Sequence, residues 1–333
     1  MTESLFQPLQ VSDITIPNCI TMSTLTCNRA EDTYPTDLMK EYYVQRFHGG
    51  AGLIVTEGTL ITRQGYSHPN CHRTESGLWD DKHVEGWKNI TYAVHDAVWH
   101  VGRAAHPEAY QQKLAGEPVY ALSAISARGG KFRTIPGILG YVTFVAQFKH
   151  AAINAKKAGF DGVELHGANG YLIAQFLDTT SNHRTDEWGG SKENRSRLGL
   201  EVLKALIEVF GKNVALKVTP AGGYNDVGMP LDETFRYFIS EADKLGLAYI
   251  TLSRYSPSFD AVYNGVPRAT KHDVLEGAEL VAAGKIDAIS IGLKWTTHPD
   301  LTKRVEHHKP LDNVPDNSGD WSTGYTDYPV AVY

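Results

Sequence analysis

The sequence predicts an α/β fold, either a (β/α)8-type barrel or a doubly wound sheet. Short apolar runs alternate with amphipathic helical runs along most of the 333 residues. Polar residues follow the ends of several apolar runs, as they do where an active site lies at the carboxyl ends of parallel strands. No GxGxxG motif follows the first apolar run and opens a helix, which counts against a dinucleotide-binding doubly wound sheet.

Six apolar runs are expected to form strands that are buried on both faces of a parallel sheet. These runs are residues 20–26, 52–58, 162–168, 214–220, 249–253 and 288–293. Since no linker or low-complexity segment divides the chain, residues 1–333 are expected to form one domain.

Three helices are predicted between these strands, and a glycine follows each of them. The helix over 144–158 places Phe144, Phe148 and several alanines on one face. Glycine favours the left-handed conformation that commonly ends a helix. The predicted helices and their terminating glycines are 144–158 with Gly159, 193–210 with Gly211, and 232–244 with Gly246.

Composition excludes several classes of protein. The net charge of -6 gives no basic face for nucleic acid. No run approaches the roughly 18 apolar residues needed to span a membrane, and the start of the chain lacks the pattern of a secretory signal. The three cysteines, Cys19, Cys27 and Cys71, have no CxxC spacing, so neither a disulfide framework nor a metal site is expected. These features favour a cytoplasmic protein.

The stretch VELHGANGYLIAQFLDTTSNHRTDEWGGSKENR (163–195) carries the main chemical motif. His166, Asn169 and Tyr171 follow the end of a predicted strand within six residues. His and Asn side chains can donate hydrogen bonds to a carbonyl oxygen, and a tyrosine can act as a general acid. We therefore expect these three residues to be catalytic.

This stretch resembles the old yellow enzyme family of flavin-dependent ene-reductases. Further similar motifs are PLQVSDITIPN near the start, EYYVQR (41–46), WHVGRAAHP (99–107) and the terminal GYTDYPVAVY. The resemblance implies a TIM barrel, preceded by an N-terminal hairpin, with FMN at the C-terminal mouth. It also implies that His166 and Asn169 bind a substrate carbonyl oxygen and that Tyr171 donates a proton.

The resemblance also assigns residues to the flavin and to the substrate pocket. Those that would hold FMN, if FMN is retained, are Thr26, Gly58, Lys217 and Gly292. Those that would line the substrate pocket are Thr26, Trp99 and Tyr325.

Three departures from the family pattern indicate a modified barrel. VHDAVWHVG (94–102) runs from a helix almost directly to Trp99, so the family's strand between them is missing, and Ala97 stands where the family has a flavin-binding Gln. A second strand is missing before Gly277. The family's Gly-Arg phosphate clamp reads Gly292-Leu293, and Leu cannot make the charge-assisted contact of Arg. The sequence thus predicts six strands, with the gaps covered by residues 108–142 or by a second copy in a homodimer.

These departures lead to the expectation that the protein uses no cofactor. The predicted function is a flavin-independent cyclase or isomerase, such as a Diels–Alder type catalyst, acting on an unsaturated carbonyl intermediate of fungal secondary metabolism. Two alternatives stay open: an FMN- and NAD(P)H-dependent ene-reductase, with the missing segments due to a faulty gene model, and a non-catalytic binding scaffold.

Overall fold

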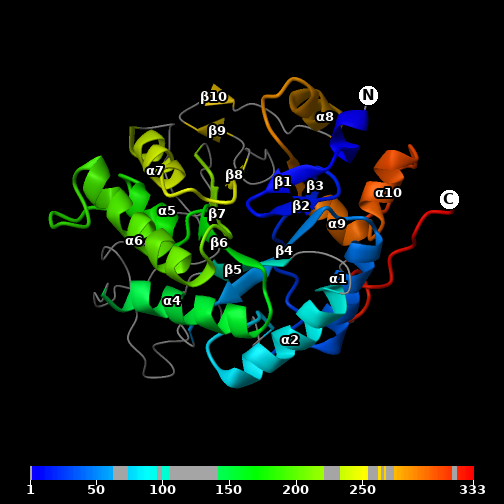
Figure 1. The fold of residues 1–333 in the computed structure, drawn as a ribbon, viewed down its shortest axis with the longest axis horizontal. Coiled ribbons are helices and arrows are strands. Elements are labelled where there is room, and N and C mark those ends of the chain that lie inside the picture. The colour runs from blue at the N-terminus through cyan, green and yellow to red at the C-terminus, as the bar shows by residue number, and fades with distance from the viewer. Residues whose placement is uncertain are drawn as a thin grey trace.

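A parallel sheet surrounded by helices forms the centre of the molecule in this computed structural model (Figure 1). The structure describes residues 2–62, 74–95, 100–105, 142–220, 233–253, 262–263, 266–267, 274–316 and 321–333. The strands of the main sheet are β3 (Ile20–Met22), β4 (Leu53–Leu60), β5 (His100–Ala105), β6 (Gly162–Gly167), β7 (Val214–Val218), β8 (Ile250–Leu252) and β11 (Ile289–Ile291). Two small hairpins add β1 (Leu9–Val11), β2 (Ile14–Ile16), β9 (Val262–Tyr263) and β10 (Val266–Pro267).

The helices follow the strands in alternation, as a (β/α)-type barrel requires. They are the 3-10 helix η1 (Glu3–Phe6) and the α-helices α1 (Asp37–His48), α2 (Asp81–His95), α4 (Val142–Lys157), α5 (Leu172–Leu177), α6 (Lys192–Phe210), α7 (Glu233–Asp243), α8 (Val274–Ala282), α9 (Leu293–Thr297) and α10 (Leu301–Glu306). In the part of the chain that is described, none of these helices has the length and apolar character to cross a membrane.

The seven strands of the main sheet lie in the order β11-β3-β4-β5-β6-β7-β8, and every adjacent pair is parallel. Because parallel strands run the same way, their carboxyl ends meet at one face, the mouth of the barrel. Within the described residues β8 and β11 are the two outer strands and do not pair with each other. The part of the barrel that is described is therefore open at this point, and Leu252 at the end of β8 is 57% exposed.

The prediction of a modified barrel is confirmed, but the prediction that two strands are missing is wrong for the first of them. Strand β5 lies at 100–105, paired with β4 on one side and β6 on the other. The sequence reading missed it because the run begins with a histidine and contains an arginine, so it lacks the continuous apolar pattern of its neighbours. The second predicted gap matches the opening between β8 and β11 in the described sheet. Residues 108–142 were predicted to cover such a gap, and nearly all of them lie outside the described residues.

The predicted N-terminal hairpin is present and closes the amino end of the barrel. Strands β1 and β2 pair antiparallel, with Val11 opposite Ile14 and Leu9 opposite Ile16. Val11 and Ile16 form a buried cluster with two inward residues of β4, Leu53 and Val55. This burial of apolar surface keeps water from the barrel interior at the end away from the mouth.

The three predicted helices form α4, α6 and α7, with bounds that differ from the prediction by two residues or fewer. Ser191 caps α6 by accepting a hydrogen bond from the backbone N–H of Asn194, and Gly211 ends it at a φ of 59°. Helices α6 and α7 pack closely, since a Cβ on Gly199 would lie 2.6 Å from the Phe238 ring. Helix α6 packs against β6 and β7, α4 packs against β5 and β6, and α7 packs against α6 (Figure 1).

Arg46 fastens the C-terminal segment 321–333 to the barrel. Its side chain is fully buried at the end of α1. The guanidinium donates to the backbone carbonyls of Trp295 and Thr296, at 3.1 and 2.7 Å, and to that of Tyr325 at 3.0 Å. It also lies 3.6 Å from the centre of the Tyr42 ring. Five donors in a fixed plane allow arginine to join several carbonyls at once, which a lysine cannot do.

Replacing Arg46 with leucine is expected to lower the free energy of unfolding by about 3 kcal/mol or more, because several buried carbonyls lose their donor together. The measurement is urea denaturation followed by circular dichroism. The matched control is Arg236→Leu at an exposed position of α7, expected to stay within about 0.5 kcal/mol of the wild type. Similar losses in the two variants would show that Arg46 has no special part in stability.

Candidate functional site

His166 lies at the carboxyl end of β6, inside the mouth of the barrel. It is directly opposite Lys217 in the register of β6 and β7, so the two side chains leave the sheet on the same face. His166 is 3% exposed and Lys217 is 7% exposed. The parallel register therefore brings an imidazole and an ammonium group together at the end of two adjacent strands.

Lys217 reaches across the barrel. Its Nζ donates a 2.8 Å hydrogen bond to the hydroxyl of Ser23, in the segment that follows β3. Since β3 and β7 are separated in the sheet by three other strands, this contact spans the interior. It fixes the position of a buried positive charge at the mouth.

The turn after β6 holds Asn169 in a left-handed backbone conformation. Its φ is 57°, and that of Gly170 is 70°. Asparagine and glycine accept this conformation more readily than other residues do. The hydroxyl of Thr219, just after β7, donates to Asn169 Oδ1 at 3.2 Å. The side-chain carbonyl of Asn169 therefore faces Thr219, and the amide NH₂ is the donor group of this side chain.

Tyr171 completes a group of side chains that we call the mouth cluster: Ser23, His166, Asn169, Tyr171, Lys217 and Thr219. Tyr171 precedes the first residue of α5, and its ring centre lies 5.4 Å from that of His166. It is half-buried, whereas His166 is buried. The structure thus brings together the three residues that the sequence predicted to be catalytic, along with Lys217.

The positions that the resemblance assigns to a flavin also gather around the mouth. Gly58 lies on β4, beyond a break in the register between Val55 and Gly58. Thr26 is exposed after β3, and near it the buried Thr24 hydroxyl makes no hydrogen bond to any described group. A Cβ on Gly292 would contact only Leu25, at an ordinary 3.6 Å, so the backbone there is open to a close approach.

A second group, the tyrosine cluster, lies beside the mouth and consists of Cys27, Tyr42, Tyr43, Glu57 and Tyr325. Tyr325 stacks on Tyr42 with ring centres 4.1 Å apart and planes inclined by 2°. It is 1% exposed, and the Arg29 guanidinium lies 5.1 Å from its ring centre. Tyr325 is thus packed behind the mouth, and its lining of a substrate pocket stays a prediction.

Glu57 is the buried acid of the tyrosine cluster. It sits in the irregular part of β4, a β-bulge, and such bulges redirect side chains near active sites. Its backbone N–H donates to the Tyr43 hydroxyl at 3.0 Å. Burial, and secondarily repulsion from Glu75, raises the pKa of the Glu57 carboxyl to about 8. The positive charge of Arg29 lowers the pKa of Glu57 but does not cancel this rise, so the carboxyl is mostly protonated at neutral pH.

A partly open cavity of about 20 Å³ lies between the strands and the helices α4 and α6. Its walls are apolar, with Phe148, Val163 and Leu206 among them. The space suits a single water molecule and lies away from the mouth cluster. It is a packing feature and has no part in the candidate site.

The sequence showed Glu57 and Thr219 as polar residues at the ends of predicted strands, on the face where an active site is expected, but it assigned a role to neither. Their partners are distant in the sequence and could not be recognised from a local pattern. Two other predicted positions, Ala97 and Trp99, lie outside the described residues.

Comparisons with known proteins give one consistent result. Residues 4–312 match the family described as "NADH:flavin oxidoreductase / NADH oxidase family". The chain is 37% identical to the "Probable flavin mononucleotide-dependent alkene reductase" of Leishmania infantum over 366 aligned positions, covering 98% of this chain and 97% of the relative. It is 36% identical to the "Probable inactive reductase easA" of Epichloe festucae var. lolii over 376 positions, covering 99% and 96%.

Among solved structures, morphinone reductase superposes with a TM-score of 0.87 at 31% identity, covering 98% of this chain and 96% of that one. Both alignments with curated relatives span more positions than the 333 residues of this chain. Each relative therefore carries residues without a counterpart here.

Replacing Glu57 with glutamine is expected to remove a pH dependence of stability. The folded-state pKa of Glu57, about 8, lies above its ordinary value of 4.5. The stability it contributes is therefore complete below pH 4.5 and is lost as the pH rises through 8. The unfolding free energy of the wild type, relative to Glu57→Gln, should fall by roughly 3–5 kcal/mol over this window.

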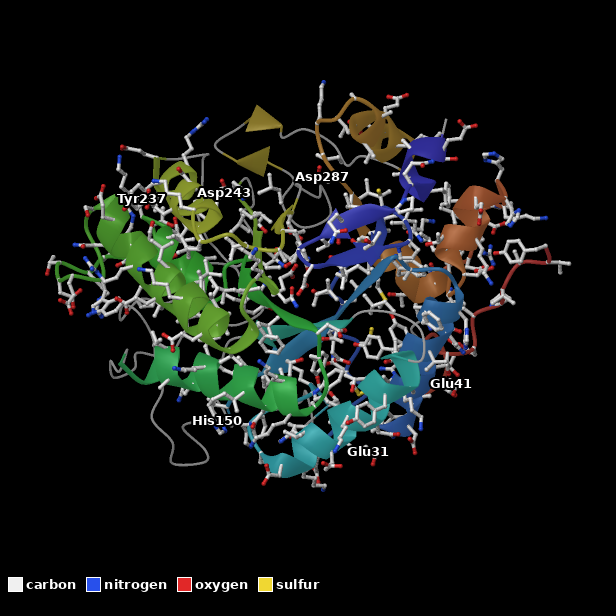
Figure 2. The ribbon with its side chains drawn as sticks, viewed as in Figure 1. Glu31, Glu41, His150, Tyr237, Asp243 and Asp287 are labelled. Carbon is white, nitrogen blue, oxygen red and sulfur yellow. The ribbon has the colours of Figure 1, made fainter. Side chains whose placement is uncertain are left out.

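The measurement is chemical denaturation at several pH values from 4.5 to 9. The control is Glu41→Gln on the outer face of α1 (Figure 2), where Glu41 is exposed and the difference from the wild type should not vary with pH. If the difference in unfolding free energy between the wild type and Glu57→Gln did not vary with pH, the assignment of a buried, protonated carboxyl would be contradicted.

Proposed function

The chain belongs to the NADH:flavin oxidoreductase / NADH oxidase family, and from this premise we propose that it is an FMN- and NAD(P)H-dependent ene-reductase that acts on an unsaturated carbonyl compound. The predicted resemblance to flavin-dependent ene-reductases is thereby confirmed. The observation that carries the proposal is the mouth cluster, in which His166, Asn169 and Tyr171 converge beside a buried Lys217.

The expectation that the protein uses no cofactor is wrong. The family that the chain matches along residues 4–312 is one of flavin oxidoreductases, and a relative covering nearly the whole chain is named as flavin mononucleotide-dependent. The prediction of a flavin-independent cyclase depended on that expectation and is withdrawn with it. Cyclisation, isomerisation and a purely binding role become outcomes of the tests below.

The residues at the mouth fit the ring system of a flavin. The unpartnered hydroxyl of Thr24 and the open backbone at Gly292 offer polar contacts and space. Lys217 supplies a fixed positive charge on the same side as His166, and a cation beside a flavin ring favours the negative charge of its reduced form. We assign the binding of the ring to Thr26, Gly58 and Lys217. When bound, FMN supplies a hydride that it has received from NAD(P)H.

The chain's own residues would activate the substrate. His166 and Asn169 would donate hydrogen bonds to one carbonyl oxygen, which would draw electron density from a conjugated double bond. The bond from Thr219 orients the Asn169 amide for this purpose. Tyr171, next to the His166 ring, would give a proton to the carbon adjacent to the carbonyl as the alkene is reduced.

Three further expectations remain predictions. A homodimer would cover the open edge of the sheet at β8, since exposed strand edges readily pair with another chain. A cytoplasmic location and a substrate from fungal secondary metabolism rest on composition and on the resemblance alone.

Substituting the carbonyl-binding pair tests the proposal. We expect the wild type to consume NADPH in the presence of a cyclic enone, and His166→Ala or Asn169→Ala to lower the turnover roughly ten- to a thousandfold, the usual effect of removing a stabilising donor. The control is His150→Ala on the outer face of α4 (Figure 2), expected to change turnover less than about twofold. Undiminished turnover in a His166/Asn169 double variant would rule out carbonyl activation by this pair.

Tyr171→Phe tests the proton donor separately. We expect enone reduction to fall roughly a hundredfold, because a general acid contributes on this scale. NADPH oxidation by dioxygen should persist, since that reaction delivers no proton to a carbon atom. Stopped-flow absorbance of NADPH under air and of the enone without air gives both rates. Equal losses in the two reactions would show that Tyr171 acts through structure and not as an acid.

A further inference from the structure

Ser23 lies one residue beyond β3, at the mouth of the barrel. Its backbone N–H donates to the carbonyl of Ile291 at 2.8 Å, so the pairing of β3 with β11 extends to this residue and fixes its backbone. The Ser23 side chain is buried, with 9% of its surface exposed. Because a paired strand holds a side chain more precisely than a loop does, the Ser23 hydroxyl has a defined place at the mouth.

The hydrogen bond between Lys217 and Ser23 determines which way the Ser23 hydroxyl can act. An ammonium group carries three hydrogens and no lone pair, so Lys217 Nζ donates and Ser23 Oγ accepts in this 2.8 Å bond. The hydrogen of the Ser23 hydroxyl must therefore point to a different acceptor. The part of the chain that the structure describes gives Ser23 Oγ no second hydrogen-bond partner. This hydrogen is thus a donor that a ligand in the mouth can use.

Lys217 also makes the Ser23 hydroxyl a stronger donor. A hydroxyl oxygen that accepts a hydrogen bond from a cation loses electron density, and its own O–H then binds an acceptor more strongly. Since both side chains are buried, water screens this polarisation little. The positive charge of Lys217 thus acts beyond its own position, from the end of β7 to the hydroxyl at the end of β3.

A flavin ring offers an acceptor whose charge changes during the reaction. The pyrimidine edge of the ring carries carbonyl oxygens and a ring nitrogen, and this edge becomes negative when the flavin is reduced. Hydrogen bonds to a charged acceptor are roughly twice as strong as those to a neutral one. A donor at this edge therefore binds the reduced flavin more tightly than the oxidised flavin and raises its reduction potential.

We propose that Ser23 is a flavin-binding residue whose hydroxyl, held and polarised by Lys217, donates to the pyrimidine edge of the ring and favours its reduced form. This inference rests on the proposed function, because it requires that a flavin is bound. It adds a donor to the ring-binding residues Thr26, Gly58 and Lys217. It also gives Lys217 a second part, since the ammonium group orients the Ser23 hydroxyl in addition to supplying its own charge.

The reduction potential of FMN bound to the full-length protein tests this assignment without any turnover. In Ser23→Ala the reduced form should lose roughly tenfold more affinity than the oxidised form, which lowers the potential of this two-electron couple by about 30 mV. Ser23→Cys keeps the shape of the side chain but replaces the hydroxyl with a weak thiol donor, and its potential should fall nearly as far.

The matched control is Ser4→Ala. The Ser4 hydroxyl donates to the carbonyl of Ala278 at 2.9 Å, in a contact between η1 and α8, so its loss should leave the potential unchanged. Circular dichroism checks that each variant folds. An unchanged potential in both Ser23 variants, with FMN bound, would overturn the proposal and leave the proposed function intact. If the wild type binds no flavin, the proposed function fails as well.

A double-mutant cycle with Lys217→Met separates a direct donor from a residue that only holds Lys217 in place. When Lys217 is already replaced, Ser23→Ala should lower the potential further, but by less than it does in the wild type. The hydroxyl still donates to the ring in that background, although it is no longer polarised. No further change would show that Ser23 acts only through the position of Lys217. A change as large as in the wild type would show that Lys217 does not polarise the hydroxyl, and either result contradicts the proposal.

Discussion

The parallel register of the seven strands is the constraint on which the candidate site depends. Because every adjacent pair runs the same way, residues far apart in the chain meet at one end of the sheet. His166 faces the same side as Lys217 through a direct pairing of β6 and β7, and Lys217 then reaches Ser23 across the interior. A shift of one residue in either strand would turn these side chains to the helices and empty the mouth of its polar groups.

The structure supports this register from both ends. The β1–β2 hairpin closes the amino end with apolar side chains, while Arg46 ties α1 to α9 and to the C-terminal segment near the mouth. Arginine suits this position because its several N–H donors can bind the backbone carbonyls of Trp295, Thr296 and Tyr325 at the same time. The segment held in this way carries Tyr325, which stacks on Tyr42 in the tyrosine cluster.

Much of this fold could be predicted from the sequence, but the contacts that hold it could not. The six apolar runs and three helices were visible because their patterns are local. Strand β5 was not, since its pairing with β4 and β6 outweighs a weak local pattern. The bulge that redirects Glu57 is a feature of register alone, and the partners of Arg46 lie about 250 residues away in the chain. His166, Asn169 and Tyr171 were found because one turn supplies all three.

The altered barrel is compatible with the family membership. Among the described residues the opening between β8 and β11 lies on one side of the mouth, whereas the mouth cluster is built on β3, β6 and β7. The sequence correctly located the altered side, at Gly292-Leu293. We had inferred from this alteration that the protein uses no cofactor, and that inference was wrong. Most of the polar contacts at the mouth come from other strand ends, those of β3, β6 and β7.

The mass of the product formed from a cyclic enone and NADPH tests the central claim most directly. A reductase adds two hydrogen atoms, so the account predicts a product two mass units heavier than the substrate, with deuterium incorporated when deuterated NADPH is used. A product of unchanged mass would contradict the account and would indicate a cyclase or an isomerase. Recovery of the substrate alone, with no NADPH consumed, would point to a binding protein.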